Sequence, residues 1–307
     1  MNYLILGAGG FLGKQSCRYF HDKLHTVTGI SRNRNLVDLT NQSDCEQLFK
    51  NRKVDVLLQF AASTTNSKDV VEKPWVHVTD NAVMNSYIFK YAVEHKVKHV
   101  IFPSCTTMYP GDLGRPVKEE DFDRDRIYSK YFGVASTKVY IEDMCKFWSQ
   151  QGDTKFTVIR HSNIYGPGDR FDQATAHVCG ATIKKVLDSG PNRDIAVWGD
   201  GTEVRDLLYI DDLMDAISVI TEKQTDKYAL FNVGSGVPIT VTNLTKEVMK
   251  VAKKETSKVV FNGTAPTLKF SLVLDSSKLN TLGWKPKTSL SVGLGRTIDW
   301  YKKNGKV

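Results

Sequence analysis

Short apolar runs alternate with longer amphipathic stretches through the first half of the chain. The runs that resemble strands cover residues 2–8, 26–30, 54–62, 99–105 and 156–163, and helical patterns lie between them, for example over residues 43–51 and 81–96. Strands that alternate with helices predict βαβ units and a parallel sheet. The strand runs are rich in Val, Ile and Leu, which is typical of strands buried on both faces.

The pattern changes after Gly166. Residues 166–180 are rich in Gly and Asp, and a helical pattern returns over residues 241–254, without an internal repeat or a low-complexity linker. We therefore expect an α/β fold with a doubly wound parallel sheet and a smaller, interwoven α/β lobe. The predicted sheet domain covers residues 1–165 plus about 204–235, and the predicted substrate-binding lobe covers about 166–203 and 236–307.

The composition of the 307-residue chain narrows the class of protein. With 41% hydrophobic and 25% charged residues it can bury a large core. No apolar run is long enough to span a membrane, and no basic region precedes the first apolar run as in a signal peptide. The formal charge is +8, but the basic residues are spread along the chain, so we expect no nucleic-acid partner.

The five cysteines are scattered along the chain: Cys17, Cys45, Cys105, Cys145 and Cys179. They lack the spacing of metal ligands, and an odd, dispersed set suits free thiols in a reducing compartment. The sequence therefore predicts no metal site and a cytoplasmic location.

A glycine pattern follows the first predicted strand directly. Gly7, Gly10 and Gly13 form a G-x-x-G-x-x-G turn that opens a helix. Such glycines let the backbone approach a pyrophosphate, and the helix start offers free N–H groups, so the turn predicts Rossmann-type dinucleotide binding. The residues expected at the cofactor are those of the turn and of the third strand's end: Gly7, Gly10, Phe11, Leu12, Gly13 and Ala61.

The end of the second predicted strand bears on the choice of cofactor. NAD sites usually carry an acid about 20 residues after the glycine turn. Here Ser31, Arg32 and Arg34 stand in its place, and guanidinium groups suit a 2′-phosphate. We therefore expect NADP, with NAD as the alternative and with Asp38 as an acceptor for the adenine amine.

Several segments together resemble a known family. In order along the chain they read "FPSCTTMYPGD", "SNIYGPGDRFDQATAHV", "VWGDGTEVRDLLYIDDL" and "FNVGSG". This series is similar in order and spacing to the extended short-chain dehydrogenase/reductase family, also called the NAD-dependent epimerase/dehydratase family, and within it to the GDP-L-fucose synthases. The resemblance implies an NADP-dependent reductase/epimerase acting on a keto-deoxy sugar that is linked to a nucleotide, most naturally GDP.

The resemblance also implies roles for individual residues. Lys138 would hold the nicotinamide ribose and lower the pKa of a catalytic tyrosine, and His177 would be an acid/base group in epimerisation. The remaining residues implied in the substrate site are Thr107, Asn163, Lys185, Trp198 and Arg205. A homodimer formed by the helices near 80–96 and 138–150 is implied as well. For Trp198, the alternative is a core residue.

Three positions depart from the family pattern. Cys105 stands where the family has a hydroxyl residue, although Thr106 and Thr107 follow it and could supply a hydroxyl. Thr107 stands where the fucose synthases have an acid/base cysteine. Val134, four residues before Lys138, stands at the position of the catalytic tyrosine.

The missing tyrosine leaves three hypotheses for the proton donor. Tyr131 lies seven residues before Lys138, so a straight helix places it on the same side but one turn too far away. Tyr131 could act as a displaced donor; Tyr109, Tyr128 or a threonine could donate instead; or an efficient donor could be absent. Three functions also stay open: a reductase/epimerase, a 4-epimerase or dehydratase that retains NAD, and a non-catalytic binder of cofactor or sugar nucleotide, which the lost tyrosine suggests.

Overall fold

The computed structural model describes residues 1–64, 73–172, 175–190, 193–263 and 271–304. Its largest sheet contains the strands β1 (Asn2–Leu6), β2 (Thr26–Ile30), β3 (Val56–Gln59), β4 (His99–Pro103), β5 (Lys155–His161) and β9 (Tyr228–Val233). The strands lie in the order β2-β1-β3-β4-β5-β9, and each neighbouring pair is parallel. This arrangement confirms the predicted parallel sheet.

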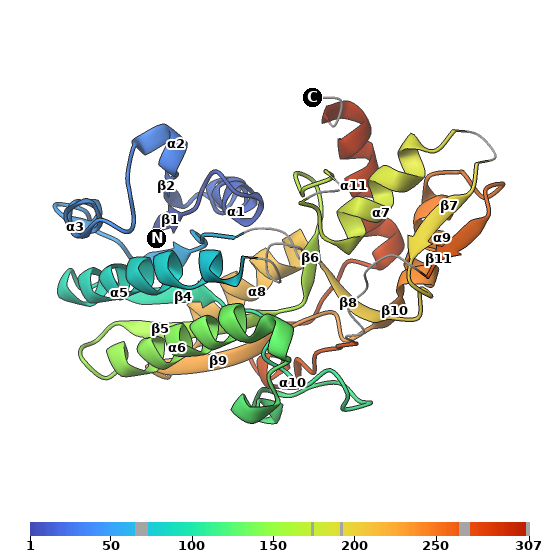
Figure 1. Ribbon diagram of the computed structural model, residues 1–307. Coiled ribbons are helices and arrows are strands. Elements are labelled where there is room, and N and C mark those ends of the chain that lie inside the picture. The colour runs from blue at the N-terminus through green and yellow to red at the C-terminus, as the bar shows by residue number, and fades with distance from the viewer. Residues whose placement is uncertain (65–72, 173–174, 191–192, 264–270, 305–307) are drawn as a thin grey trace.

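Helices cover both faces of the sheet (Figure 1). One face carries α1 (Phe11–Asp22) and α8 (Ile210–Lys223), and the other carries α3 (Gln42–Phe49), α5 (Thr79–Glu94) and α6 (Phe132–Trp148). Alternate residues of β1 separate accordingly: Tyr3 and Ile5 belong to the core with α1, whereas Leu4 and Leu6 belong to the core with α5. The doubly wound fold is therefore confirmed.

The second lobe is woven from distant parts of the chain. Its strands are β6 (Asn163–Tyr165), β7 (Ile195–Trp198), β8 (Val204–Tyr209), β10 (Pro238–Thr240) and β11 (Val259–Asn262). Its helices are α7 (Val178–Asp188), α9 (Val241–Val251) and α11 (Leu290–Asn304). Strand β8 pairs with β10 and β6 in a three-stranded sheet that is separate from the large sheet. The predicted boundary, which groups about 204–235 with residues 1–165, stays a prediction. The chain rejoins the large sheet through α8 and β9.

Two buried aspartates attach the C-terminal part of the chain to the rest. Asp206 on β8 accepts hydrogen bonds from the backbone N–H groups of Ser235, Gly236 and Leu274. Asp212 accepts from the backbone of Lys287 and Thr288 instead of capping its own helix. Its carboxylate therefore fixes a distant segment, although its place at the start of α8 is typical of a cap.

A buried ion pair joins α6 to β5 beneath the segment that follows β4. Arg160 Nη2 lies 2.6 Å from Glu142 Oε2, and both side chains are about 95% buried, with exposures of 4% and 5%. Ser104 also donates to Glu142. Arg160 Nη1 donates to the hydroxyl of Tyr109 (2.9 Å), which donates in turn to Asn232 Oδ1 (2.7 Å). The network fixes both ends of the segment between Ser104 and Tyr109.

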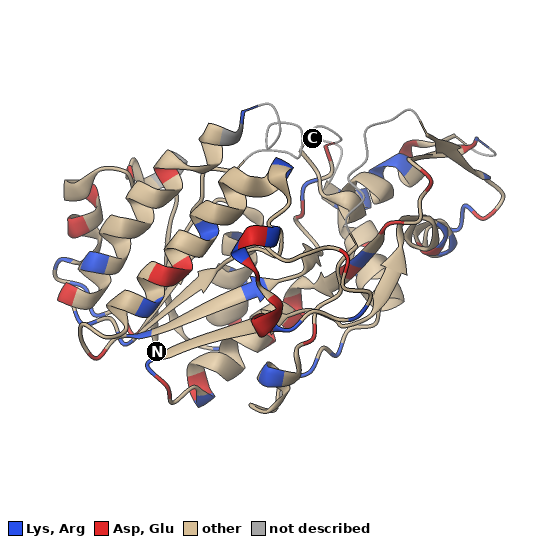
Figure 2. Cartoon of the chain, turned by 60° about the horizontal axis from the view of Figure 1, so that its bottom comes forward, with Lys and Arg blue, Asp and Glu red and all other residues tan. Residues whose placement is uncertain are grey.

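Positions of positively and negatively charged residues are intermixed along the helices and loops in the view of Figure 2. No helix among the described residues is long and apolar enough to cross a bilayer. All five cysteines are free.

Replacing Arg160 with Met is expected to lower the free energy of unfolding by about 3–5 kcal/mol, because the Glu142 carboxylate stays buried without its partner. Urea unfolding followed by circular dichroism measures the change. The matched control is Lys227→Met, which removes an exposed pair with Asp153 and should cost about 0–1 kcal/mol. Equal effects of the two substitutions would contradict the importance assigned to the buried pair.

Candidate active site

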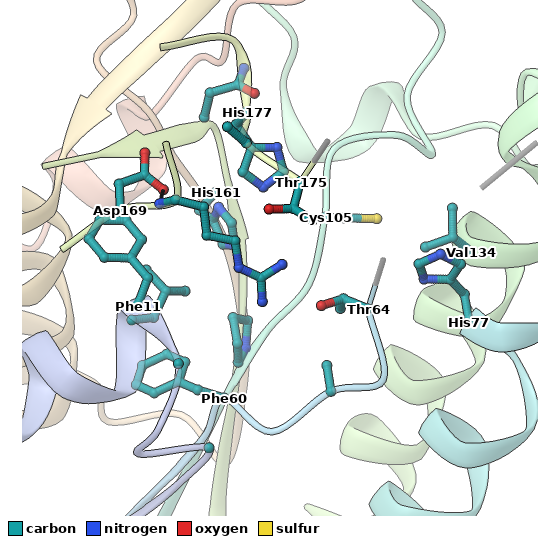
Figure 3. Close-up of a pocket in the computed structure, with 18 of the residues that line it drawn as sticks. Phe11, Phe60, Thr64, His77, Cys105, Val134, His161, Asp169, Thr175 and His177 are labelled. Atoms are coloured by element: carbon teal, nitrogen blue, oxygen red, sulfur yellow. Dashed lines mark hydrogen bonds between the residues drawn. The ribbon is translucent and has the colours of Figure 1, made fainter. Parts of the chain in front are cut away.

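A cavity of about 1140 Å³ lies between the carboxyl ends of the parallel strands and the second lobe. It runs from the glycine turn past Lys138 to β7 and β8, and Figure 3 shows the side chains at its centre. Pockets for one small molecule usually measure about 300–1,000 Å³. The cavity is therefore large enough for a dinucleotide and a second ligand, and its place matches the crevice in which α/β sheets bind ligands.

The glycine turn forms one end of the cavity. Gly7 has a φ of +79°, and a Cβ atom there would lie 2.6 Å from the backbone N of Ala61; at Gly13 it would lie 2.2 Å from Gly7 O. Helix α1 begins after Gly10 without a side-chain cap. Its first N–H groups and dipole therefore suit a pyrophosphate. Every predicted residue of the turn and strand end lines the cavity: Gly7, Gly10, Phe11, Leu12, Gly13 and Ala61.

An arginine and an aspartate lie close together in the segment that follows β2. Ser31, Arg32 and Asp38 all line the cavity, and Arg32 Nη2 lies 3.7 Å from Asp38 Oδ2. Hydrogen bonds from Thr40 hold the pKa of Asp38 below its usual range. The side chain of Arg34 lies outside the described residues. An exposed guanidinium is thus available for a 2′-phosphate, beside a carboxylate that already has partners.

Lys138 lies deep in the cavity. Its ammonium donates to the carbonyl of Pro103 (3.0 Å) and lies 4.5 Å from the centroid of the Phe102 ring. Burial lowers its pKa, and the charges of Cys105, Glu142 and Cys145 oppose this shift. Of these three groups, only Cys105 lines the cavity.

The segment after β4 directs alternate side chains into the cavity. Cys105 and Thr107 line it, with Sγ and Oγ1 3.0 Å apart. Thr106 was expected to face the crevice, but it is not among the described residues that line it. Its carbonyl accepts from the N–H of Tyr109 (3.1 Å), and the resulting turn points the neighbours of Thr106 inward.

Val134 and Tyr131 both lie on the cavity wall, at the start of α6. Burial raises the pKa of Tyr131, and the guanidinium of Arg205 in the second lobe partly opposes this rise. Tyr131 is not among the described groups whose charge acts on Lys138. Tyr131 and Arg205 therefore line the same cavity.

The residues predicted for the sugar nucleotide lie at the other end of the cavity. Lys185 Nζ donates to the carbonyl of Ala196 (2.7 Å) and lies 5.5 Å from the centroid of the Trp198 ring. Trp198 is 53% exposed and so is not a core residue. Arg205 donates to the carbonyl of Val204, and burial lowers its pKa. A cation beside an open aromatic ring, with Arg205 in the same cavity lining, suits a nucleoside diphosphate.

Asn163, His177 and Thr107 line the same cavity between these two ends. Asn163 Nδ2 donates to the carbonyl of Asp206 (3.3 Å), which orients its amide. His177 precedes α7, and burial, followed by the charge of Arg170, lowers its pKa. A neutral imidazole at this position can accept a proton.

Sequence reasoning missed His161, at the end of β5. Its Nδ1 lies 2.8 Å from the carbonyl of Ser162. A carbonyl only accepts, so Nδ1 carries the proton and Nε2 carries a lone pair. Burial lowers the pKa of His161 to about 4, and Lys138 and His177 act in the same direction. The sequence did show that His161 is a polar residue at the carboxyl end of a predicted strand, and this position could have indicated a site residue.

Two further residues were missed for different reasons. Asp169 is 7% exposed, burial raises its pKa to about 7, and its Oδ2 has no hydrogen-bond partner in the structure. It belongs to the Gly- and Asp-rich segment, where composition does not single it out. His77 ends the short helix η1 (Pro74–His77), which packs against α6, and both His77 and Val134 line the cavity. Only tertiary packing brings these two residues together.

The fold and the site define an α/β enzyme that binds a nicotinamide dinucleotide beside a second ligand. A sequence model of the NAD dependent epimerase/dehydratase family matches residues 3–234, and the chain belongs to this family. The expected extended short-chain dehydrogenase/reductase is thereby confirmed, and with it an NAD(P)-dependent enzyme.

Individual relatives are similar over nearly the whole chain. A putative GDP-L-fucose synthase 2 of Arabidopsis thaliana is 29% identical over 302 residues, which cover 98% of this chain and 91% of the relative. The UDP-glucose 4-epimerase of Thermotoga maritima, solved with UDP-glucose, has a TM-score of 0.86 at 24% identity and full coverage of both chains. A GDP-D-glycero-L-gluco-heptose synthase of Campylobacter jejuni, solved with NADPH, also has a TM-score of 0.86, at 20% identity and 98% coverage of each chain.

Proposed function

We propose that this protein is an NADP-dependent reductase/epimerase of a keto-deoxy sugar nucleotide, with GDP as the nucleotide. The observation that supports this most directly is the single cavity that joins the glycine turn to Lys185, Trp198 and Arg205. A cofactor at one end and a sugar nucleotide at the other would bring the nicotinamide and the sugar together near Lys138. The GDP-L-fucose synthase relatives favour GDP over other nucleotides.

Different residues of the cavity would serve different parts of the proposed reaction. Arg32 and Ser31 hold the adenosine end of the cofactor, and a bound dihydronicotinamide supplies a hydride. Lys138 orients the nicotinamide ribose and contributes a positive charge where the carbonyl oxygen becomes negative. His177, with its lowered pKa, accepts or returns a proton at the carbon beside the carbonyl.

A 4-epimerase or dehydratase that retains NAD is the second candidate. The carboxylate of Asp38 beside Arg32 favours it, because an anion near the adenosine ribose repels a 2′-phosphate. Thr107 favours it as well, since a threonine in place of a thiol removes one of the two proton-transfer groups expected in a fucose synthase.

The first experiment follows the nicotinamide absorbance of the purified protein with NADPH and GDP-4-keto-6-deoxymannose, and with NADH in parallel. Oxidation of NADPH is expected, since a cofactor and a sugar nucleotide bound in this one cavity would meet near Lys138. Bound NAD after purification, with redox-neutral epimerisation and no oxidation of either cofactor, would support the second candidate. Cofactor binding without turnover of any sugar nucleotide would contradict both and indicate a non-catalytic binder.

Arg32→Gln should weaken NADPH binding by about 10- to 100-fold, because it removes a charge-assisted contact to the 2′-phosphate. NADH binding should change by less than about threefold, since NADH lacks that phosphate. Dissociation constants from nicotinamide fluorescence provide the measurement. Arg18→Gln, an exposed arginine on α1 outside the cavity, is the control. Equal losses for both cofactors would argue against a 2′-phosphate contact at Arg32.

A homodimer through α5 and α6 is also part of the proposal. The two helices pack side by side, and α6 exposes Tyr140 (50%) and Phe147 (54%). Solution scattering should give about twice the 34.5 kDa mass of one chain, and Tyr140→Glu should shift the protein toward the monomer. A monomeric mass for the unchanged protein would contradict the dimer.

A further inference from the structure

The proposed reduction needs a proton for the carbonyl oxygen. Val134 stands four residues before Lys138, at the position where the family carries its catalytic tyrosine. A valine side chain has no proton to transfer. The donor must therefore be another group that lines the cavity close to Lys138, because the lysine charge stabilises the anion that the donor leaves behind.

The tyrosines are poorly placed for this step. Tyr109 is fully buried beside Arg160 and Asn232 and does not line the cavity. Tyr128 is 40% exposed and also lies outside the cavity lining. Tyr131 lines the cavity, but it stands at the N-cap of α6, seven residues before Lys138, so about 10 Å of helix rise separates the two backbone positions. We therefore expect its hydroxyl to bind the substrate rather than to donate the proton near Lys138.

His161 is close to Lys138 but has the wrong tautomer for a donor. Its Nδ1 proton is engaged with the carbonyl of Ser162, so Nε2 has only a lone pair. Its pKa of about 4 keeps the ring neutral above that pH. His161 can therefore accept a hydrogen bond from a ligand, but it has no proton to give at neutral pH.

Cys105 meets the geometric requirements. Cys105 and Lys138 both line the cavity, and Lys138 Nζ donates to the carbonyl of Pro103 (3.0 Å), two residues before Cys105. Figure 3 shows its sulfur directed toward the side of the cavity where Val134 and His77 lie. Thr107 Oγ1, 3.0 Å from Sγ, holds the thiol in this position. Burial raises the pKa of the thiol, which keeps it protonated at neutral pH, and Lys138 lowers the energy of its anion.

We propose that Cys105 is the general acid of the reaction, with Lys138 as its charge partner. This inference rests on the proposed reductase function. The S–H bond of Cys105 would break and its proton would pass to the carbonyl oxygen, while a bound reduced nicotinamide would supply the hydride to the carbonyl carbon. The products would be the alcohol, the oxidised nicotinamide and a thiolate near the Lys138 ammonium, and a proton from solvent would then restore the thiol.

Steady-state kinetics with NADPH and the keto-sugar nucleotide test the assignment. Cys105→Ser should lower kcat by about 100-fold or more, in the range of a lost general acid, while KM and the dissociation constant of NADPH stay within about threefold. Cys17→Ser, a cysteine outside the cavity, is the matched control and should keep the full rate. Tyr131→Phe should raise KM and keep kcat within about tenfold.

Thiol alkylation gives a second measurement that needs no turnover. Iodoacetamide modification of the Cys105 peptide, followed by mass spectrometry without cofactor, should accelerate with rising pH as the thiolate forms. The rate kcat should fall with rising pH around the same midpoint, because the acid must be protonated. Lys138→Met should move the alkylation midpoint to higher pH, since it removes the charge that stabilises the thiolate.

Each outcome bears on one conclusion. A Cys105→Ser variant that keeps kcat within tenfold would overturn the assignment. An alkylation midpoint that stays at the same pH in Lys138→Met would overturn it as well. A 100-fold loss of kcat in Tyr131→Phe or His77→Gln, with Cys105→Ser unaffected, would transfer the role to that residue. A wild-type protein that oxidises no NADPH would instead count against the proposed reductase function.

Discussion

The buried ion pair between Arg160 and Glu142 is the interaction on which the site depends. It joins β5 to α6, and through Ser104 and Tyr109 it fixes the segment that carries Cys105 and Thr107. Because a buried charge without a partner is costly, α6 can hardly shift along the sheet. The position of Lys138, one turn before Glu142 on the same helix, is set by this contact as much as by the cofactor.

Burial explains the shifted pKa values of the titratable groups that line the cavity. Burial lowers the pKa values of Lys138, His161 and His177 and raises those of Cys105 and Asp169. These shifts all favour the neutral forms. A site in which neutral acids and bases surround one ammonium is suited to moving protons, and charges that develop during the reaction would be felt strongly there.

The site was predictable where a local pattern carries the chemistry. The glycine turn follows a strand and opens a helix, so consecutive residues carry its function. Each residue predicted for the turn lines the cavity. Thr106 does not line the cavity, although its neighbours Cys105 and Thr107 do, and the sequence does not show which of three adjacent polar residues points inward. His161 and Asp169 were missed because the sequence does not display burial, which gives both groups their unusual pKa values.

The sequence by itself determined the parallel sheet, its two layers of helices and the dinucleotide turn, because hydrophobic periodicity and glycine spacing act over a few residues. The tertiary structure decided that β8 pairs with β6 and β10, that Tyr131 and Arg205 line one cavity, and that Cys105 and Lys138 line it as well. These relations join residues far apart in the chain. They depend on how helices and strands pack against one another, which no local pattern of the sequence encodes.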